Sequence, residues 1–257
     1  MTTEDEILFE CSGEIGWITF NRPRARNALT FGMYRRLAGI CSNPPAELRT
    51  LVISGAGGEA FAAGTDISQF RDFTSRQHAI DYEATMDEVL GAVEACEVPT
   101  IAAIDGACTG GGAAIAAACD LRIATSAMKF GFPIARTLGN CLSAANIARL
   151  NALIGAGRVR EMIFLSRLMK AEEALRVGLV SEILDSHEAL MARARELAGR
   201  LAGQAPLTLR ATKEIQRRLA RVEVEDEDWI VRCYTSEDFR EGLDAFLTKR
   251  EPQWKGR

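Results

Sequence analysis

Three successive glycines at residues 110–112 are the feature that most constrains this chain. An apolar run at 99–104 precedes them and predicts a buried strand, while the alanine-rich residues after them favour a helix. A helix that begins at such a turn leaves free N–H groups and the positive end of its dipole. The turn therefore suits an anion or a developing oxyanion. Taken alone, the glycines favour the simpler interpretation of a tight turn with close helix packing.

The composition is that of an ordinary globular protein. The 257 residues are enough for one large domain or two smaller ones. The formal net charge is −4, which gives no basic surplus for nucleic acid or an anionic membrane. No apolar run approaches the roughly 20 residues that span a bilayer, and the acidic N-terminus is not typical of a signal peptide. We therefore expect a cytoplasmic protein that binds neither nucleic acid nor membrane.

Cysteine and histidine give little support for metal or nucleophilic chemistry. Seven cysteines are scattered without a C-x-x-C pair, which favours reduced thiols. The two histidines, His78 and His187, both lie among polar residues. A histidine-ligated metal site or a Ser-His-Asp triad is therefore hard to build, and we expect no bound metal.

Strands and helices alternate along most of the sequence before a helical C-terminal third. Short apolar runs predict strands at residues 7–11, 16–20, 50–54, 99–104, 121–125 and 179–184. Helical spacing predicts helices at residues 30–40, 76–94, 188–201, 206–219, 225–234 and 237–249, with two or three more before residue 177. This order predicts an α/β core with right-handed crossovers and a helical tail.

Two loops carry polar residues. Arg22, Arg24 and Arg26 place three cations within five residues, either as a solvated loop or as a contact to phosphate. A second turn rich in small residues lies at 60–67, and Asp66 within it is typical of a helix N-cap.

Five sequence blocks together resemble the enoyl-CoA hydratase/isomerase (crotonase) superfamily. They follow the family order and cover nearly the whole chain, although each block alone is weak evidence. The blocks are N-R-P-x-x-x-N-A-L at 21–29, F-A-A-G-x-D-I at 61–67, G-x-x-x-G-G-G…C-D at 106–120, A-x-E-A-x-x-x-G-L-V at 171–180, and S-E-D-x-x-E-G…A-F-x-x-K-R at 236–250.

The resemblance implies an α/β fold built as a spiral of β-β-α turns that carries a C-terminal helical trimerisation region. We place the spiral core at residues 1–195 and the helical region at 196–257. The resemblance also implies a homotrimer or a dimer of trimers. Its ligand would be an acyl-CoA thioester, with coenzyme A as part of the substrate and no separate cofactor.

The same resemblance maps site residues onto the two glycine turns. The backbone N–H groups of Thr65 and Gly111 correspond to the pair that binds the thioester oxygen. Two such fixed donors stabilise an enolate-like oxyanion, and loss of one typically costs roughly 10²–10³ in rate. The residues that map to substrate binding are Arg24, Ala25, Arg26, Ala63, Gly64, Asp66, Ile67, Gly110, Ala114, Ile134, Phe246 and Lys249.

The chain departs from the hydratases of the family at two positions. Those enzymes carry two glutamates, at positions that correspond here to Ala114 and Ile134, twenty residues apart. Hydration needs one group to activate water and one to deliver a proton to the α-carbon. Alanine and isoleucine do neither, so the sequence argues against two-glutamate hydration.

The loop at residues 135–143 is one residue longer than the usual family loop and offers other polar groups to the acyl end. We regard Arg136 as a candidate catalytic residue that would bind a carboxylate or polarise a carbonyl, because arginine cannot act as a base. Asn140 and Ser143 are further candidates. Cys141 has no evident histidine partner, which favours an inert thiol.

Three hypotheses for function remain open. The first is an acyl-CoA enzyme that stabilises a thioester enolate, acting as a hydratase, isomerase, decarboxylase or hydrolase. The second is a non-catalytic acyl-CoA-binding protein that keeps the pocket without the carboxylates. The third, an RNA-binding or scaffold use of the trimer, gains little support from the balanced charge.

Overall fold

The computed structural model describes residues 3–70, 76–220, 236–248 and 250–257. Its larger sheet has six strands in the order β1-β2-β3-β5-β7-β10, in which β1 and β2 are antiparallel and the other neighbours are parallel. The strands are β1 (Ile7–Ser12), β2 (Ile15–Phe20), β3 (Thr50–Gly55), β5 (Thr100–Ile104), β7 (Leu121–Thr125) and β10 (Ile183–Leu184). Both β3 and β5 are buried along their whole length, which explains the apolar runs at 51–53 and 101–104 within them.

A second sheet of four short strands runs beside the first, in the order β4-β6-β8-β9. These strands are β4 (Ala60–Ala62), β6 (Ala107–Thr109), β8 (Lys129–Gly131) and β9 (Met169–Lys170). Along the chain β4, β6 and β8 follow β3, β5 and β7, and a helix follows each pair. The observed order is therefore the predicted spiral of β-β-α turns.

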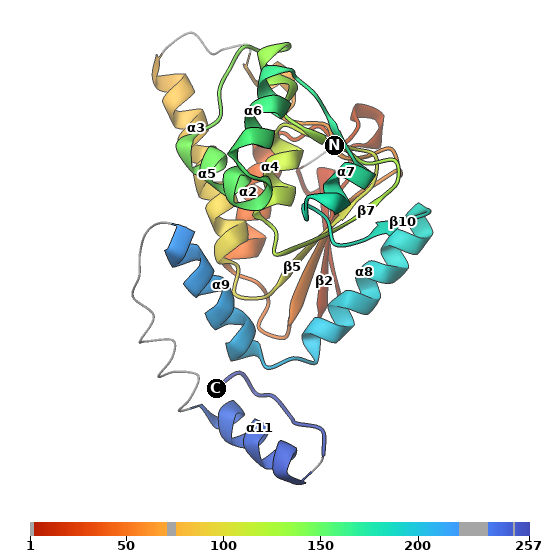
Figure 1. The fold of residues 1–257 in the computed structure, drawn as a ribbon, viewed down its shortest axis with the longest axis vertical. Coiled ribbons are helices and arrows are strands. Elements are labelled where there is room, and N and C mark those ends of the chain that lie inside the picture. Colours follow the sequence, from red (N-terminus) through yellow and green to blue (C-terminus); the bar gives the residue numbers. More distant parts are fainter. Residues whose placement is uncertain (1–2, 71–75, 221–235, 249) are drawn as a thin grey trace.

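Helices surround the sheets (Figure 1). They are α1 (Thr3–Glu6), α2 (Phe31–Ser42), α3 (Arg76–Ala95), α4 (Gly111–Ala118), α5 (Ala144–Ile154), α6 (Ala156–Phe164), α7 (Ala171–Arg176), α8 (His187–Ala202), α9 (Pro206–Ala220) and α11 (Glu237–Thr248). Short 3-10 turns are η1 (Pro23–Ala25), η2 (Ile67–Phe70) and η3 (Pro133–Ala135). None of the helices, over the residues described, is long and apolar enough to cross a membrane.

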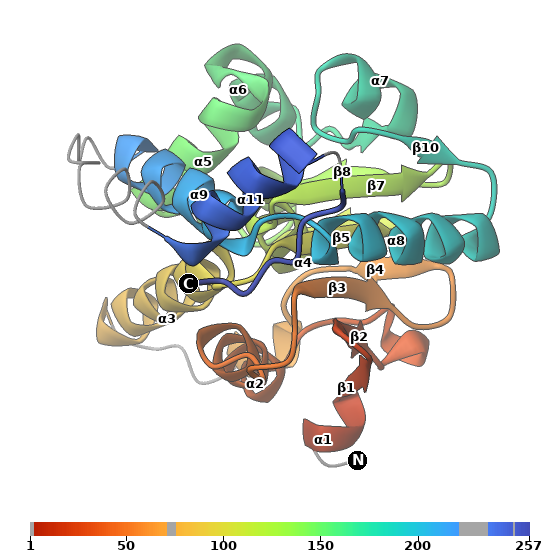
Figure 2. The same ribbon diagram turned by 90° about the horizontal axis from the view of Figure 1, so that it is seen from below.

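The two faces of the larger sheet pack against different helices. Val52 and Ile101 face α8, which runs along the sheet and contributes Leu190 and Ala194 to that apolar cluster (Figure 2). Neighbouring residues such as Ile53 point the other way, into the main core with α2, α3 and α4. This alternation follows from the two-residue period of a strand.

Helix α4 is buried within the main core. Its residues from Gly112 to Ala118 are all buried. A Cβ atom placed on Gly112 would lie 2.3 Å from the carbonyl oxygen of Ala62 in β4. The close-packing interpretation of the glycine run therefore holds for Gly112.

Most predicted elements are present. The helix predicted at 30–40 is α2, and Thr30 caps it, because its Oγ1 accepts the N–H of Met33. The strand predicted at 179–184 is shorter, since the N–H groups of Leu179 and Val180 bond to the carbonyl of Ala174 in the turn after α7. The helix predicted at 225–234 lies outside the described residues. The proposed boundary at residue 195 falls within α8, and the division there stays a prediction.

The C-terminal helix α11 lies apart from the α/β body in Figure 1. The residues after it return to the surface of the α/β body. The Trp254 carbonyl accepts a hydrogen bond from Arg49 at 3.1 Å, and its indole N–H donates to the Gly203 carbonyl at 3.1 Å.

Candidate functional site

Two glycine bends from successive turns of the spiral lie against each other. Gly64 follows β4 with φ 104°, and Gly110 precedes α4 with φ 52°, both in the range that favours glycine. A Cβ atom on Gly110 would lie 3.3 Å from the Cα of Gly64. A Cβ atom on Gly111 would lie 3.3 Å from Oγ1 of Thr65. The fold thus brings together the residues that follow each bend, Thr65 and Gly111.

The backbone N–H groups of these two residues have no acceptor in the described part of the chain. Gly111 is the first residue of α4, so its N–H cannot join the hydrogen bonds of the helix. Around Thr65, the N–H of Leu29 bonds to Gly64 at 2.8 Å and the N–H of Asp66 bonds to Leu29 at 2.9 Å. These two hydrogen bonds hold the bend in place, and the N–H of Thr65 takes part in neither.

Two tyrosines hold the side chain of Thr65. Its Oγ1 lies 2.8 Å from the Tyr34 hydroxyl and 3.0 Å from the Tyr82 hydroxyl. Burial raises the pKa of both tyrosines above the usual value, so both hydroxyls stay protonated at neutral pH. The three hydroxyl groups therefore form a neutral chain of hydrogen bonds that fixes Thr65.

A cavity of about 190 Å³ opens beside the two bends, and most of its lining is apolar. The residues predicted from the motifs that line it are Ala63, Gly64, Thr65, Ile67, Gly110, Gly111, Ala114 and Ile134. Two exposed apolar side chains, Ile67 at 61% and Leu138 at 46% exposure, belong to this lining. Ala114 and Ile134 thus line one cavity together with Thr65 and Gly111.

Helix α3 contributes a carboxylate that the sequence motifs did not indicate. Among the described residues that line the cavity, Glu83 is the one with a charged side chain. Burial, and next the nearby Asp87, raise the pKa of the Glu83 carboxyl, while the N–H of Ser143 acts in the opposite direction. In the sequence, Glu83 could have been found from its spacing to Met86 and Leu90, because residues three and seven positions apart share one face of a helix. Met86 and Leu90 line the same cavity.

Comparisons with known proteins give the family of the chain. The family model described as enoyl-CoA hydratase/isomerase matches residues 10–257. The chain belongs to the enoyl-CoA hydratase/isomerase family. A short-chain-enoyl-CoA hydratase of Clostridium acetobutylicum is 30% identical over 254 residues, which is 96% of each chain. A carnitinyl-CoA dehydratase of Citrobacter koseri is 35% identical, over 98% of this chain and 99% of the relative.

Solved structures of this family have the same fold. The crystal structure of an enoyl-CoA hydratase/carnithine racemase from Magnetospirillum magneticum superposes with a TM-score of 0.91 at 33% identity, over 98% of this chain and 96% of that one. DspI of Pseudomonas aeruginosa superposes with a TM-score of 0.89 at 32% identity, over 97% of each chain. The resemblance inferred from the motifs is therefore confirmed for both the family and its fold.

The arginine loop lies next to the first bend. The carbonyl of Arg26 accepts the N–H of Ala63 at 3.0 Å, and the side chains of Arg24, Ala25 and Arg26 are exposed. None of these three side chains is part of the cavity lining. Their predicted contact with coenzyme A stays a prediction for this member of the family.

Asp66 and Arg22 have structural partners. Arg22 lies 2.9 Å from the Asp66 carboxylate and 3.2 Å from that of Glu6. Asp66 also accepts hydrogen bonds from the N–H and the hydroxyl of Ser68, as the N-cap interpretation predicts. Ser68 and, more weakly, Arg22 lower the pKa of the Asp66 carboxyl. Asp66 therefore stabilises the bend, and its predicted role in substrate binding stays untested.

The loop after β8 reaches the cavity with residues other than Arg136. Thr137, Leu138 and Asn140 line the cavity, whereas the exposed Arg136 caps η3 and is not part of the lining. Ser143 caps α5, accepting the N–H of Asn146 at 3.2 Å. The catalytic role of Arg136 stays a prediction.

Two predicted binding residues are at the C-terminus. Phe246 belongs to α11, where the structure places its backbone only, and Lys249 lies outside the described residues. Their predicted contact with the substrate therefore stays a prediction, as does the trimer of the family.

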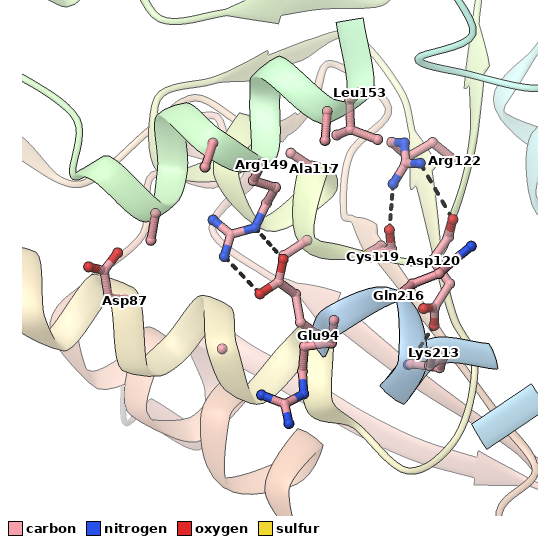
Figure 3. A pocket seen from close by; sticks show the side chains of 16 residues that line it. Asp87, Glu94, Ala117, Cys119, Asp120, Arg122, Arg149, Leu153, Lys213 and Gln216 are labelled. Atoms are coloured by element: carbon pink, nitrogen blue, oxygen red, sulfur yellow. Dashed lines mark hydrogen bonds and ion pairs between the residues drawn. The ribbon is translucent and has the colours of Figure 1, made fainter. Parts of the chain in front are cut away.

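A second cavity of about 400 Å³ lies at the other end of α4, beside Ala117 and Cys119 (Figure 3). Charged side chains pair with one another there. Glu94 lies 2.5 Å from Arg149, and Asp120 lies 2.6 Å from Lys213. Cys119 and Asp120, the C-D of the third sequence block, line this cavity, but none of the predicted site residues that the structure describes does.

Proposed function

We propose that the chain binds an acyl-CoA thioester in the cavity beside Gly111 and stabilises the enolate of its acyl group. One observation carries the proposal. Thr65 and Gly111, whose N–H groups have no acceptor among the described residues, lie against each other at the positive end of α4. A thioester oxygen gains negative charge as the α-proton leaves, and fixed donors in a site shielded from water stabilise that charge strongly.

The rest of the cavity suits the acyl chain. Its mostly apolar lining favours hydrocarbon, and Ile67 and Leu138 offer exposed apolar surface. The exposed Arg24 and Arg26 lie in the loop that supports the bend and would reach the phosphates of coenzyme A. We propose no cofactor beyond the coenzyme A of the substrate, and a homotrimer or dimer of trimers as the assembly.

The reaction that we propose is not two-glutamate hydration. Ala114 and Ile134 occupy the two relevant positions in the cavity, and neither side chain transfers a proton. The names of the relatives, a hydratase and a dehydratase of CoA thioesters, support the substrate class. The names of these relatives do not support the same reaction in a chain that has Ala114 and Ile134 at these positions.

Acetoacetyl-CoA tests the enolate step directly. This β-keto thioester ionises readily to an enolate that absorbs in the near ultraviolet, so binding at fixed donors is expected to increase the enolate band. Replacing Gly111 by proline removes one N–H, at a helix position that tolerates proline. Because a Cβ atom on Gly111 would lie 1.8 Å from the Tyr34 hydroxyl, the substitution is made in a Tyr34→Phe background, with Tyr34→Phe alone as control.

We expect the enolate band with the wild type and with Tyr34→Phe, and its loss with the double variant. An equal band in the double variant would overturn the proposed role of the Gly111 N–H. The absence of both carboxylates also favours the second candidate, a non-catalytic acyl-CoA-binding protein. Tight binding of acetoacetyl-CoA together with no turnover across a panel of acyl-CoA thioesters would identify that case.

A further inference from the structure

We propose that Glu83 is the acid–base residue of the cavity: its carboxylate removes the proton from the acyl α-carbon and returns it. The inference rests on the proposed binding of an acyl-CoA thioester. It adds a catalytic residue on α3, outside the glycine turns and outside the positions of Ala114 and Ile134.

The position of Glu83 is the first argument. It lines the same cavity as Thr65 and Gly111. The preceding residue, Tyr82, has its hydroxyl 3.0 Å from Oγ1 of Thr65, so this turn of α3 is tied to one of the two bends. Met86 lies one turn further along α3 and continues the lining. The carboxylate is therefore carried by the helix that closes the cavity beside the donors.

The surroundings of Glu83 are the second argument. Over the residues described, it has no ion-pair partner, whereas Glu94 on the same helix pairs with Arg149 at 2.5 Å. Asp87 on α3 acts on it as a like charge, and the N–H of Ser143, the N-cap of α5, donates a hydrogen bond to it. Ser143 donates its hydroxyl to Asp87 at 2.6 Å. Burial and Asp87 raise the pKa of the Glu83 carboxyl, which makes its carboxylate a stronger base.

One carboxylate is enough for a proton transfer. The bond between the α-carbon and hydrogen breaks, its electron pair forms the enolate double bond, and the carbonyl oxygen becomes the oxyanion. The proton moves to the Glu83 carboxylate. The reverse step returns it to the α-carbon or, when the substrate has a β,γ double bond, to the γ-carbon, which yields the conjugated thioester. Atoms and charge balance without a second acid or an added reagent.

A structural role is the alternative. A carboxylate that accepts the Ser143 N–H stabilises the start of α5 electrostatically, and such a role would not depend on proton exchange. The two roles differ in whether the loss of the carboxylate changes chemistry at the substrate α-carbon.

Deuterium exchange separates them. The full-length protein is incubated with butyryl-CoA in D₂O, and mass spectrometry follows deuterium at the α-carbon. We expect exchange with the wild type, a loss of roughly 10²-fold or more with Glu83→Gln, and partial activity with Glu83→Asp. Glu88→Gln is the matched control, because Glu88 is exposed on the same helix, and it is expected to exchange at the wild-type rate.

The pH profile adds a readout that a structural role would not move. The wild-type rate is expected to rise with pH through the raised pKa of Glu83, while any residual rate of Glu83→Gln lacks this step. Should Glu83→Gln not fold, as judged by circular dichroism, the profile of Glu83→Asp decides, because a shifted step supports the proposal and an unchanged step overturns it.

The outcomes also separate this inference from the proposed function. Wild-type exchange in Glu83→Gln, or no exchange by the wild type, overturns the role of Glu83. Calorimetric titration of the same wild-type sample with butyryl-CoA reports binding independently. Absence of binding overturns the proposed function itself, whereas binding without exchange overturns only the role of Glu83.

Discussion

The two ends of α4 differ in whether the protein itself supplies partners for the free backbone groups of the helix. At the C-terminal end, the buried Arg122 donates to the carbonyls of Ala116 and Cys119 and so neutralises the negative end of the helix. At the N-terminal end, the N–H of Gly111 has no acceptor among the described residues and lines a cavity. Side chains of the protein thus bind one end of the helix, while the other end is open to the cavity.

The cavities at these two ends differ in the same way. Beside the C-terminal end, Asp120 accepts hydrogen bonds from the N–H and hydroxyl of Thr100 and pairs with Lys213. Beside the N-terminal end, the pKa of Glu83 is raised mainly by burial and next by the like charge of Asp87. A charge that has an ion-pair partner is held in place by it, while a carboxylate without a partner among the described residues, in a mostly apolar cavity, is suited to exchange protons. The larger cavity is therefore the less promising site.

The largest effect on stability is expected at the C-terminal end of α4. Arg122→Met keeps an unbranched side chain of similar course through Cγ but leaves the carbonyls of Cys119 and Leu179 without their donor. We expect the free energy of unfolding to fall by about 3 kcal/mol, since buried acceptors lose hydrogen bonds to a charged group. Urea unfolding measures the loss. Deuterium exchange of butyryl-CoA by the folded fraction should stay near the wild-type rate; a large fall would mean that the two ends are coupled.

A smaller loss is expected where α4 touches β4. Gly112→Ala places a Cβ atom 2.3 Å from the Ala62 carbonyl oxygen and 2.7 Å from the Ala62 side chain, and backbone cannot easily give way. We expect a loss of about 2 kcal/mol in the free energy of unfolding, typical of overpacking in a core. Gly91→Ala, at a helix position with open space, is the matched control and should leave stability unchanged or raised. Equal melting temperatures for both variants would contradict the close contact.

The elements that could be predicted from the sequence are those whose residues stand next to one another in the chain. The strand and helix on either side of Gly110 were predicted correctly because apolar run, glycines and alanines stand next to one another in the chain. The strands β4, β6 and β8 were not predicted from the pattern. Each has three residues, too few to show a period, and pairing with strands of other turns defines them.

The candidate site shows the same limit. The motifs indicated Thr65, Gly111, Ala114 and Ile134, and these do line one cavity, although their roles await the experiments above. Glu83 was missed because the packing of α3 against the second turn of the spiral decides which of its residues face that cavity. A helical pattern shows which residues share a face, but not what the face meets.

The hydroxyl chain at the open end offers a smaller and more specific test. Tyr34→Phe removes one of the two hydroxyls that hold Thr65. We expect a loss of about 1 kcal/mol in the free energy of unfolding. The rate of α-proton exchange should fall by about tenfold, less than the roughly 10²-fold that a 1 Å displacement of a reacting group costs. Exchange that is unchanged after loss of this hydroxyl would show that the two hydrogen bonds of Leu29 alone position the bend.

The smallest effect, and the one that depends on pH, is expected from Asp66 beside the same bend. Asp66→Asn removes the charge facing Arg22 and keeps a side chain that caps η2 equally well. Because Ser68 and Arg22 lower the pKa in the folded state, the carboxylate stabilises the fold above the unfolded pKa of about 4, and this contribution disappears as pH falls through the folded pKa. With the carboxylate 22% exposed, we expect the variant to lose under about 1 kcal/mol at pH 7 and less at pH 3. Urea unfolding at both pH values measures this difference. A loss of the same size at pH 3 would assign the effect to the cap rather than to the charge, and the open end of α4 would then owe its shape to backbone hydrogen bonds alone.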